Sequence, residues 1–192
     1  MIMNRLESIL EHNRKFVENR EYETYMTDRF PDKKMVVVTC MDTRLTELLP
    51  RAMNLRNGDA KIIKNAGGIV TQPFGNIMRS ILIALYELKA TEVFIVGHHE
   101  CGMTGLNPDV VLEHMRERGI ADSTIEMLTN AGFQLDRWLT GFDNVRDSVE
   151  KSVRIVSRHP LLPPGTYVHG LIVHPVTGKL DLVVDGYTGQ AV

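Results

Sequence analysis

Short apolar runs alternate along the chain with longer segments whose apolar residues recur every three or four positions. Three runs that are rich in Val and Ile predict strands at residues 35–39, 61–64 and 92–96. Between the second and third runs, apolar residues at helical spacing predict a helix of about four turns within residues 74–89. Strand, helix and strand at this spacing form a βαβ unit, which implies a right-handed parallel crossover.

The two ends of the chain show different patterns. Leu6, Ile9 and Leu10 lie at the spacing of an amphipathic helix near the N-terminus. The C-terminal part contains two apolar runs that flank the turn pair Thr177-Gly178 and predict a hairpin of residues 167–173 and 180–184. Four further helical stretches are expected, at residues 22–28, 108–118, 123–130 and 143–157.

These elements predict an α/β fold whose sheet is mixed and mostly parallel, with one antiparallel strand at the end and helices on its flanks. A length of 192 residues fits one domain with a sizeable core. We therefore expect a single domain over residues 1–192, with residues 1–30 as an N-terminal helical arm.

Composition and charge exclude several classes of protein. A net charge of -2 gives no basic surface, so nucleic acid is not expected as a partner. The chain has no apolar run of the length that spans a membrane, and its charged N-terminal segment lacks the apolar block of a signal peptide. We therefore expect a cytoplasmic protein whose two cysteines remain reduced, as core residues, metal ligands or redox groups.

The two cysteines and one histidine follow predicted strands. Cys40 follows the first strand, whereas His98 and Cys101 follow the third with H-x-x-C spacing. Because parallel strands end at one edge of a sheet, we expect these side chains to meet there. Two sulfurs and one imidazole suit zinc, and three protein ligands leave the open fourth position of a catalytic zinc site. Water in that position would ionise near neutral pH, although the thiolates favour a somewhat alkaline optimum.

An acid and a base follow Cys40 at intervals of two residues. Asp42 is close enough to become a fourth ligand, or Arg44 could hold its carboxylate in a bidentate pair. In the paired state the carboxylate would accept a hydrogen bond from zinc-bound hydroxide and orient its lone pair. Asp42 and Arg44 are therefore predicted to act as a latch that leaves the zinc site open when paired.

The motif Cys40-x-Asp42-x-Arg44 with His98-x-x-Cys101-Gly102 resembles the β-class carbonic anhydrases, in their compact bacterial and archaeal form. The likeness extends through Lys64-Asn65-Ala66-Gly67, the helix after Gly75-Asn76 and the C-terminal Thr177-Gly178-Lys179-Leu180 turn.

This resemblance implies a parallel four-stranded core with one extra antiparallel strand. It also implies an enzyme in which zinc-bound hydroxide attacks CO2 to give bicarbonate reversibly. Cys40, His98 and Cys101 would be the ligands of one zinc per subunit, with Asp42 and Arg44 as the catalytic pair. The backbone around Gly67 and Gly102 would bind substrate. The resemblance further implies a homodimer or a dimer of dimers, with the N-terminal helix packed on the partner subunit.

Some residues depart from the family pattern. Val37 and Thr39 replace a tryptophan and a glycine that accompany a regulatory bicarbonate pocket in some members, so the departure disfavours that regulation. Gly68 stands where many members have asparagine. Two alternatives stay open: hydrolysis of a CO2 analogue such as carbon disulfide or carbonyl sulfide, and a non-catalytic zinc protein. A nucleotide-binding domain is disfavoured because the chain lacks G-x-G-x-x-G and P-loop patterns.

The other histidines carry less signal. His99 adjoins His98, and their side chains should point apart if the local backbone is extended. His99 is therefore expected to support the site from outside or to pack, with a role in proton transfer as the alternative. The remaining five are expected at the surface or in turns: His12, His114, His159, His169 and His174.

Overall fold

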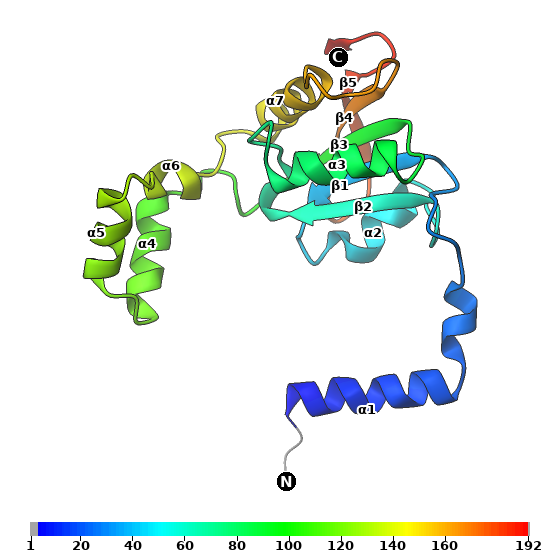
Figure 1. Cartoon of the computed structure of the whole chain (residues 1–192), viewed down its shortest axis with the longest axis horizontal. Helices are drawn as coiled ribbons and strands as arrows, with labels where there is room; N and C mark the ends of the chain where they lie inside the picture. The colour runs from blue at the N-terminus through cyan, green and yellow to red at the C-terminus, as the bar shows by residue number, and fades with distance from the viewer. Residues whose placement is uncertain (1–3, 192) are drawn as a thin grey trace.

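The computed structural model describes residues 4–191, and Figure 1 shows a twisted sheet with helices on both faces. The sheet has six strands in the order β2-β1-β3-β4-β5-β6. Their bounds are β1 Met35–Cys40, β2 Ala60–Asn65, β3 Glu92–His98, β4 Tyr167–Val173, β5 Leu180–Asp185 and β6 Gln190–Ala191. The strands β1 to β4 are parallel to one another, whereas β5 is antiparallel to β4 and β6 is antiparallel to β5. The predicted fold class is therefore confirmed, and β6 adds a short strand that was not predicted.

The interior position of β1 explains why its sequence is almost entirely apolar. All six of its residues are buried, because the strand is paired on both sides and covered on both faces. A parallel strand in that position shows a continuous apolar run rather than an alternating one. The run Met35-Val36-Val37-Val38 therefore fits β1 as an interior strand, between β2 and β3.

Helices cover the two faces of the sheet unequally. The helices α3 (Asn76–Tyr86) and α7 (Val145–Ser157) pack over Val36, Val38 and Ile95 to form the larger core cluster. The other face is covered by α2 (Leu45–Ala52) through Leu45 and Leu49. Sequence reasoning did not predict α2, which is only eight residues long and contains Pro50, a residue that usually ends a helix.

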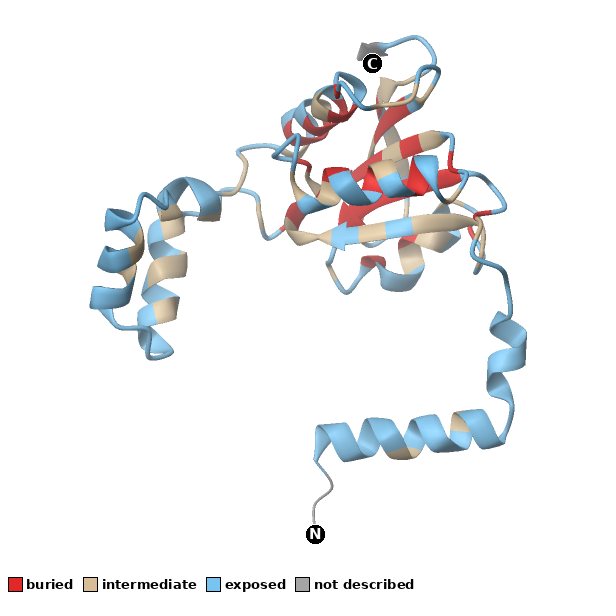
Figure 2. Ribbon diagram, viewed as in Figure 1, coloured by how far each residue is buried: buried red, intermediate tan, exposed pale blue. Residues whose placement is uncertain are grey.

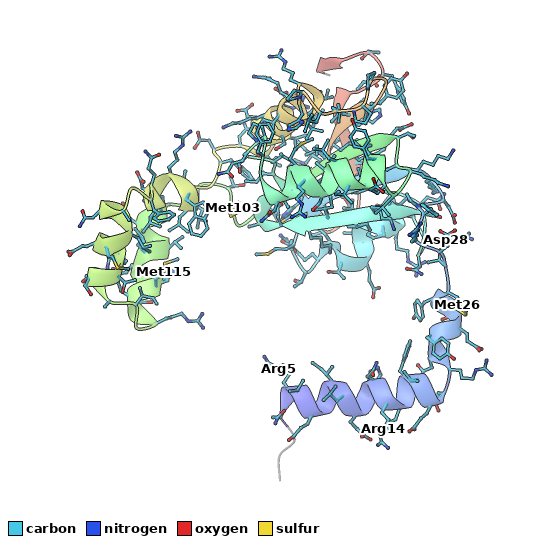
Figure 3. All side chains as sticks on the ribbon, in the orientation of Figure 1. Arg5, Arg14, Met26, Asp28, Met103 and Met115 are labelled. Atoms are coloured by element: carbon cyan, nitrogen blue, oxygen red, sulfur yellow. The ribbon has the colours of Figure 1, made fainter. Side chains whose placement is uncertain are left out.

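Two helical segments extend away from the sheet. The first is α1 (Arg5–Glu18), followed by the 3-10 turn η1 (Glu21–Tyr25). The second contains α4 (Pro108–Glu117), α5 (Asp122–Asn130) and α6 (Leu135–Leu139). Figure 2 shows that α1 is almost wholly exposed and that α4, α5 and α6 mix exposed with half-buried residues, and Figure 3 labels Arg5 and Arg14 on the first extension and Met115 on the second.

The predicted α1 forms with the expected amphipathic face, but within the described chain none of its residues is buried. Leu6, Ile9 and Leu10 are 64%, 58% and 59% exposed. The docking of this helix on a partner subunit remains a prediction. No helix among residues 4–191 combines the length and the apolar character that a bilayer crossing requires.

Candidate metal centre

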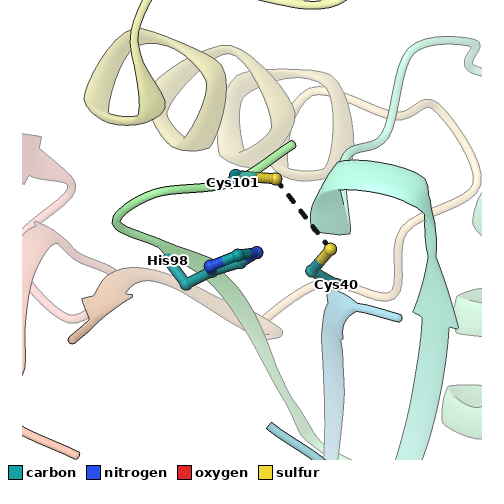
Figure 4. A group of neighbouring side chains, drawn as sticks. All are labelled: Cys40, His98 and Cys101. Carbon is teal, nitrogen blue, oxygen red and sulfur yellow. Dashed lines mark hydrogen bonds between the residues drawn. The ribbon is translucent and has the colours of Figure 1, made fainter. Parts of the chain in front are cut away.

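The carboxyl ends of β1 and β3 place the two cysteines and His98 together. β1 pairs in parallel with β3, with Thr39 opposite Val96, so Cys40 and His98 end neighbouring strands at one edge of the sheet. Cys101 lies three residues further along the loop after β3. Figure 4 shows the three side chains converging from the ends of β1 and β3 and from the loop after β3.

The three side chains have the spacing of a metal site. All are buried, and one ligand atom from each lies within 4.8 Å of the others. The two sulfur atoms are 3.9 Å apart, too far for a disulfide, whose bond length is about 2.05 Å. Two thiolates on one tetrahedral zinc, each about 2.3 Å from the metal, would lie about 3.8 Å apart. The observed separation therefore fits zinc without rearrangement of the sulfur atoms.

The hydrogen bonding of His98 leaves one ring nitrogen ready for a metal. Nδ1 lies 2.8 Å from the carbonyl oxygen of His99, and a carbonyl can only accept, so Nδ1–H is the donor. In the neutral ring Nε2 then carries the lone pair, and this buried atom has no hydrogen-bond partner. A backbone carbonyl that fixes the tautomer in this way is typical of a metal-binding histidine.

The two thiols differ in their readiness to ionise. Burial opposes ionisation of Cys40, but the His98 ring, when it is protonated, and the backbone N–H groups of Asp42 and Gly67 outweigh burial and lower the pKa of this thiol to about 7. Burial, reinforced by the adjacent Cys40, raises the pKa of Cys101 to about 11. The pair by itself therefore accommodates one negative charge near neutral pH. A bound divalent cation would supply the charge that the second thiolate requires.

Asp42 and Arg44 form the ion pair that the sequence suggested. Arg44 Nη2 donates to Asp42 Oδ2 at 2.9 Å, and Nε donates to Oδ1 at 3.1 Å. These bonds, with the Arg44 backbone N–H, lower the pKa of the Asp42 carboxyl to about 2. Oδ2 lies 3.9 Å from His98 Nε2. The carboxylate thus lies beside the candidate ligands while its oxygens are engaged by Arg44.

Sequence reasoning missed a second partner of Arg44. Its Nη1 donates to Oε2 of Glu100 at 3.0 Å, and its Nη2 donates to the Glu100 carbonyl oxygen at 3.2 Å. The sequence does place this acid next to the candidate ligands, immediately before Cys101 and two residues after His98. It does not indicate which basic residue an exposed acid in a loop will contact.

The two glycines predicted to bind substrate have different surroundings. Gly67 lies in the turn η2 (Ala66–Gly68) with φ of +83°, and a Cβ there would be 3.1 Å from the Phe142 ring and 3.2 Å from Met103. Gly102 follows Cys101, and a Cβ there would meet open space. The substrate role of both remains a prediction.

Met103 and Phe142 were also missed. Phe142 is far from Met103 along the chain, yet its backbone N–H donates to the Met103 carbonyl oxygen at 3.0 Å, which places it beside the loop after Cys101.

The other histidines correct part of the sequence interpretation. His98 is 1% exposed and His99 is exposed, as expected if their side chains point apart. The expectation that His169 lies at the surface or in a turn is wrong, because β4 buries it with its ring stacked on Phe94. His159 does lie in the turn after α7, but its side chain is also buried.

Comparison with known proteins identifies the family. The model of the carbonic anhydrase family matches residues 35–180. The chain is 61% identical over 187 residues to "Putative carbonic anhydrase YvdA" of Bacillus subtilis, covering 97% of this chain and 95% of that protein. It is 27% identical to a carbon disulfide hydrolase of Acidithiobacillus thiooxidans, covering 78% of this chain and 76% of the relative.

Among solved structures, the chain is similar to β-carbonic anhydrase isoform I of Trichomonas vaginalis. The TM-score is 0.86 with 35% identity, and the match covers 96% of this chain and 100% of the other. The chain therefore belongs to the β-carbonic anhydrase family, as its motifs indicated. It is an enzyme of that family.

Proposed function

We propose that this protein catalyses the reversible hydration of carbon dioxide to bicarbonate, with zinc held by Cys40, His98 and Cys101. The observation that carries the proposal is the pair of buried thiols 3.9 Å apart, grouped with an imidazole whose Nε2 has no other partner. A zinc ion there would supply a Lewis acid that makes water acidic enough to ionise near neutral pH.

The Asp42 carboxylate would orient the attacking water. With a pKa near 2 it is ionised and can only accept hydrogen bonds. Arg44 holds it beside the three candidate ligands, so it can accept one hydrogen of the water and turn an oxygen lone pair toward CO2. In the same arrangement Arg44 keeps Asp42 from becoming a fourth ligand, which is the open state of the predicted latch.

The loop residues would form the apolar wall that CO2 requires. Met103 and Phe142 pack against Gly67, and a Cβ there would lie only 3.1 Å from Phe142 and 3.2 Å from Met103. Gly102 borders open space, so its backbone can approach a small substrate. We propose that CO2 lies between these backbones, next to the carboxylate of Asp42.

The test is CO2 hydration by stopped flow on protein loaded with zinc, stripped of it, and reloaded. We expect activity that disappears on stripping and returns on reloading. Loaded protein that hydrates CO2 no faster than buffer alone would contradict the proposal. A closed, non-catalytic zinc site is the alternative in that case, and X-ray absorption would then find four protein ligands with Asp42 among them.

Hydrolysis of a CO2 analogue is the second candidate. The similarity to a carbon disulfide hydrolase favours it, although identity to that relative is 27% against 61% for the Bacillus protein. Rates on carbon dioxide, carbon disulfide and carbonyl sulfide, measured on one zinc-loaded preparation, separate the two. We expect carbon dioxide to be the fastest substrate by far.

We also propose a homodimer, or a dimer of dimers, in the cytoplasm. The exposed apolar side chains of α1 support a helix that is covered by a second subunit. Light scattering on the full chain and on a variant that lacks residues 1–30 tests this. We expect the truncated variant to have fewer subunits per particle, and an equal number of subunits in the two would exclude α1 from the interface.

A further inference from the structure

The guanidinium of Arg44 joins the two loops that carry the candidate ligands. One edge, formed by Nε and Nη2, donates to both carboxylate oxygens of Asp42 in the loop after β1. Nη1 donates to the side chain of Glu100 in the loop after β3, and Nη2 to its carbonyl oxygen. Arg44 therefore connects the loop that follows Cys40 to the loop between His98 and Cys101.

The backbone of Glu100 has an unusual conformation. Its φ is +55°, in the left-handed region that residues other than glycine rarely adopt. Such residues persist where their surroundings favour them, and they cluster at functional sites. In this conformation both the side chain and the carbonyl of Glu100 reach Arg44, so the contact uses two atoms of one residue.

Exposure alone would predict a weak ion pair. The side chain of Glu100 is 65% exposed and that of Arg44 is 39% exposed, and pairs of this kind contribute little on average. This pair differs because Arg44 cannot turn toward solvent without giving up its bonds to Asp42. A planar guanidinium held along two edges has a fixed orientation, which a single ion pair does not provide.

We propose that Glu100 is a positioning residue of the metal centre. Through Arg44 it fixes the position of one ligand-bearing loop relative to the other and keeps Arg44 aligned on Asp42. The inference rests on the proposed function in one respect, because it takes Cys40, His98 and Cys101 as zinc ligands. Neither the family motif nor the ligand spacing assigns this role to the residue before the second cysteine.

The chain offers a matched control far from the centre. Arg116 is 39% exposed and also bridges two carboxylates, with Nη1 3.3 Å from Glu113 and Nε 2.7 Å from Asp122. Glu113 is 63% exposed, close to the value for Glu100. Replacement of Glu113 therefore removes the same kind of surface ion pair without touching the ligand loops.

The experiment compares Glu100→Ala, Glu100→Gln and Glu113→Ala with the unaltered zinc-loaded protein. The main readout is the rate at which zinc passes to a chromophoric chelator. We expect about tenfold faster release from Glu100→Ala, a change typical of residues that support metal ligands. Glu100→Gln keeps an amide oxygen that accepts from Nη1, so its release should stay within about threefold of the unaltered rate. Glu113→Ala should leave the rate unchanged.

Melting temperature and the kcat/KM of CO2 hydration complete the comparison. We expect kcat/KM to fall in Glu100→Ala while the melting temperatures of the two alanine variants stay alike. Zinc release from Glu100→Ala no faster than from Glu113→Ala would overturn the inference, and so would release that only follows a loss of thermal stability. If no protein hydrates CO2 but Glu100→Ala still loses zinc faster, the inference stands and the proposed function fails.

Discussion

Two buried histidines on neighbouring strands show what separates a candidate ligand from a structural residue. His98 ends β3 and His169 lies early in β4, so they stand toward opposite ends of the same sheet. Both are almost fully buried, and in both Nε2 lacks a hydrogen-bond partner.

The backbone group that faces Nδ1 differs between them. His98 Nδ1 donates to a carbonyl, whereas His169 Nδ1 accepts from the backbone N–H of Gly186 at 3.1 Å. Nε2 of neutral His169 must therefore carry the hydrogen, and it points toward Oε2 of Glu92, 3.6 Å away. Only His98 presents a lone pair. The lack of a hydrogen-bond partner at Nε2 therefore does not identify a candidate metal ligand by itself. The tautomer that the backbone imposes distinguishes His98 from His169.

Matched substitutions at the two histidines should give the largest difference. His98→Gln removes a candidate ligand, so we expect its zinc content after dialysis to fall to background, as in Cys40→Ser. His169→Gln should keep one zinc per chain and lose only about 1–3 kcal/mol of unfolding free energy from a disturbed buried polar contact. Metal analysis and denaturant unfolding measure the two quantities. Equal zinc content in the two variants would abolish the distinction drawn from the tautomers.

Removal of a carboxylate near each histidine sharpens the comparison. Asp42→Ala should retain zinc but lower CO2 hydration by about tenfold to a hundredfold, because the attacking water loses its acceptor. Glu92→Ala removes the acid beside His169 and should leave turnover unchanged. Steady-state hydration with parallel metal analysis tests the pair. Unchanged turnover in Asp42→Ala would remove its proposed role.

Removal of zinc with a chelator tests whether zinc stabilises the fold only through the site at His98, and not through a site at His169. With free zinc at about a thousand times its dissociation constant, the folded state gains about 4 kcal/mol. Stripping zinc should therefore lower the melting temperature of the unaltered protein and of His169→Gln alike. His98→Gln should melt at the same temperature with and without chelator, and a chelator response in that variant would point to another zinc site.

The smallest expected effect is the difference in stability between alanine substitutions at the two glycines of the candidate centre. Gly67→Ala places a residue other than glycine in the left-handed backbone region and brings its Cβ against Phe142. The substitution should therefore cost about 1–3 kcal/mol of unfolding free energy. Gly102→Ala meets open space and should change stability by no more than about 0.5 kcal/mol. If Gly102 borders the substrate, its variant should still show a lower kcat/KM. Normal kinetics would place substrate elsewhere.

Regular local patterns made much of this structure predictable. The apolar run of β1 and the helical periodicity of α3 and α7 are local signals, and the structure has these elements within two or three residues of the expected bounds. The grouping of Cys40 with His98 and Cys101 was predictable for a related reason, since parallel strands bring their carboxyl ends to one edge.

Other features depend on contacts between residues far apart in the chain. The helix α2 is stable because Leu45 and Leu49 enter a core formed by other strands, and its local sequence with Pro50 gave no such indication. Phe142 lies close to Gly67 although the chain first passes through α4, α5 and α6, so local sequence does not reveal this contact.

The sequence by itself determined the mostly parallel α/β sheet, the candidate zinc ligands and the family to which the chain belongs. Those properties follow from periodicity and residue type, which are local. The tertiary structure alone decided the tautomer of His98, the contrasting state of His169 and the attachment of Arg44 to Glu100. Each of these depends on which backbone carbonyl, N–H group or carboxylate lies opposite a given nitrogen, and folding sets that geometry.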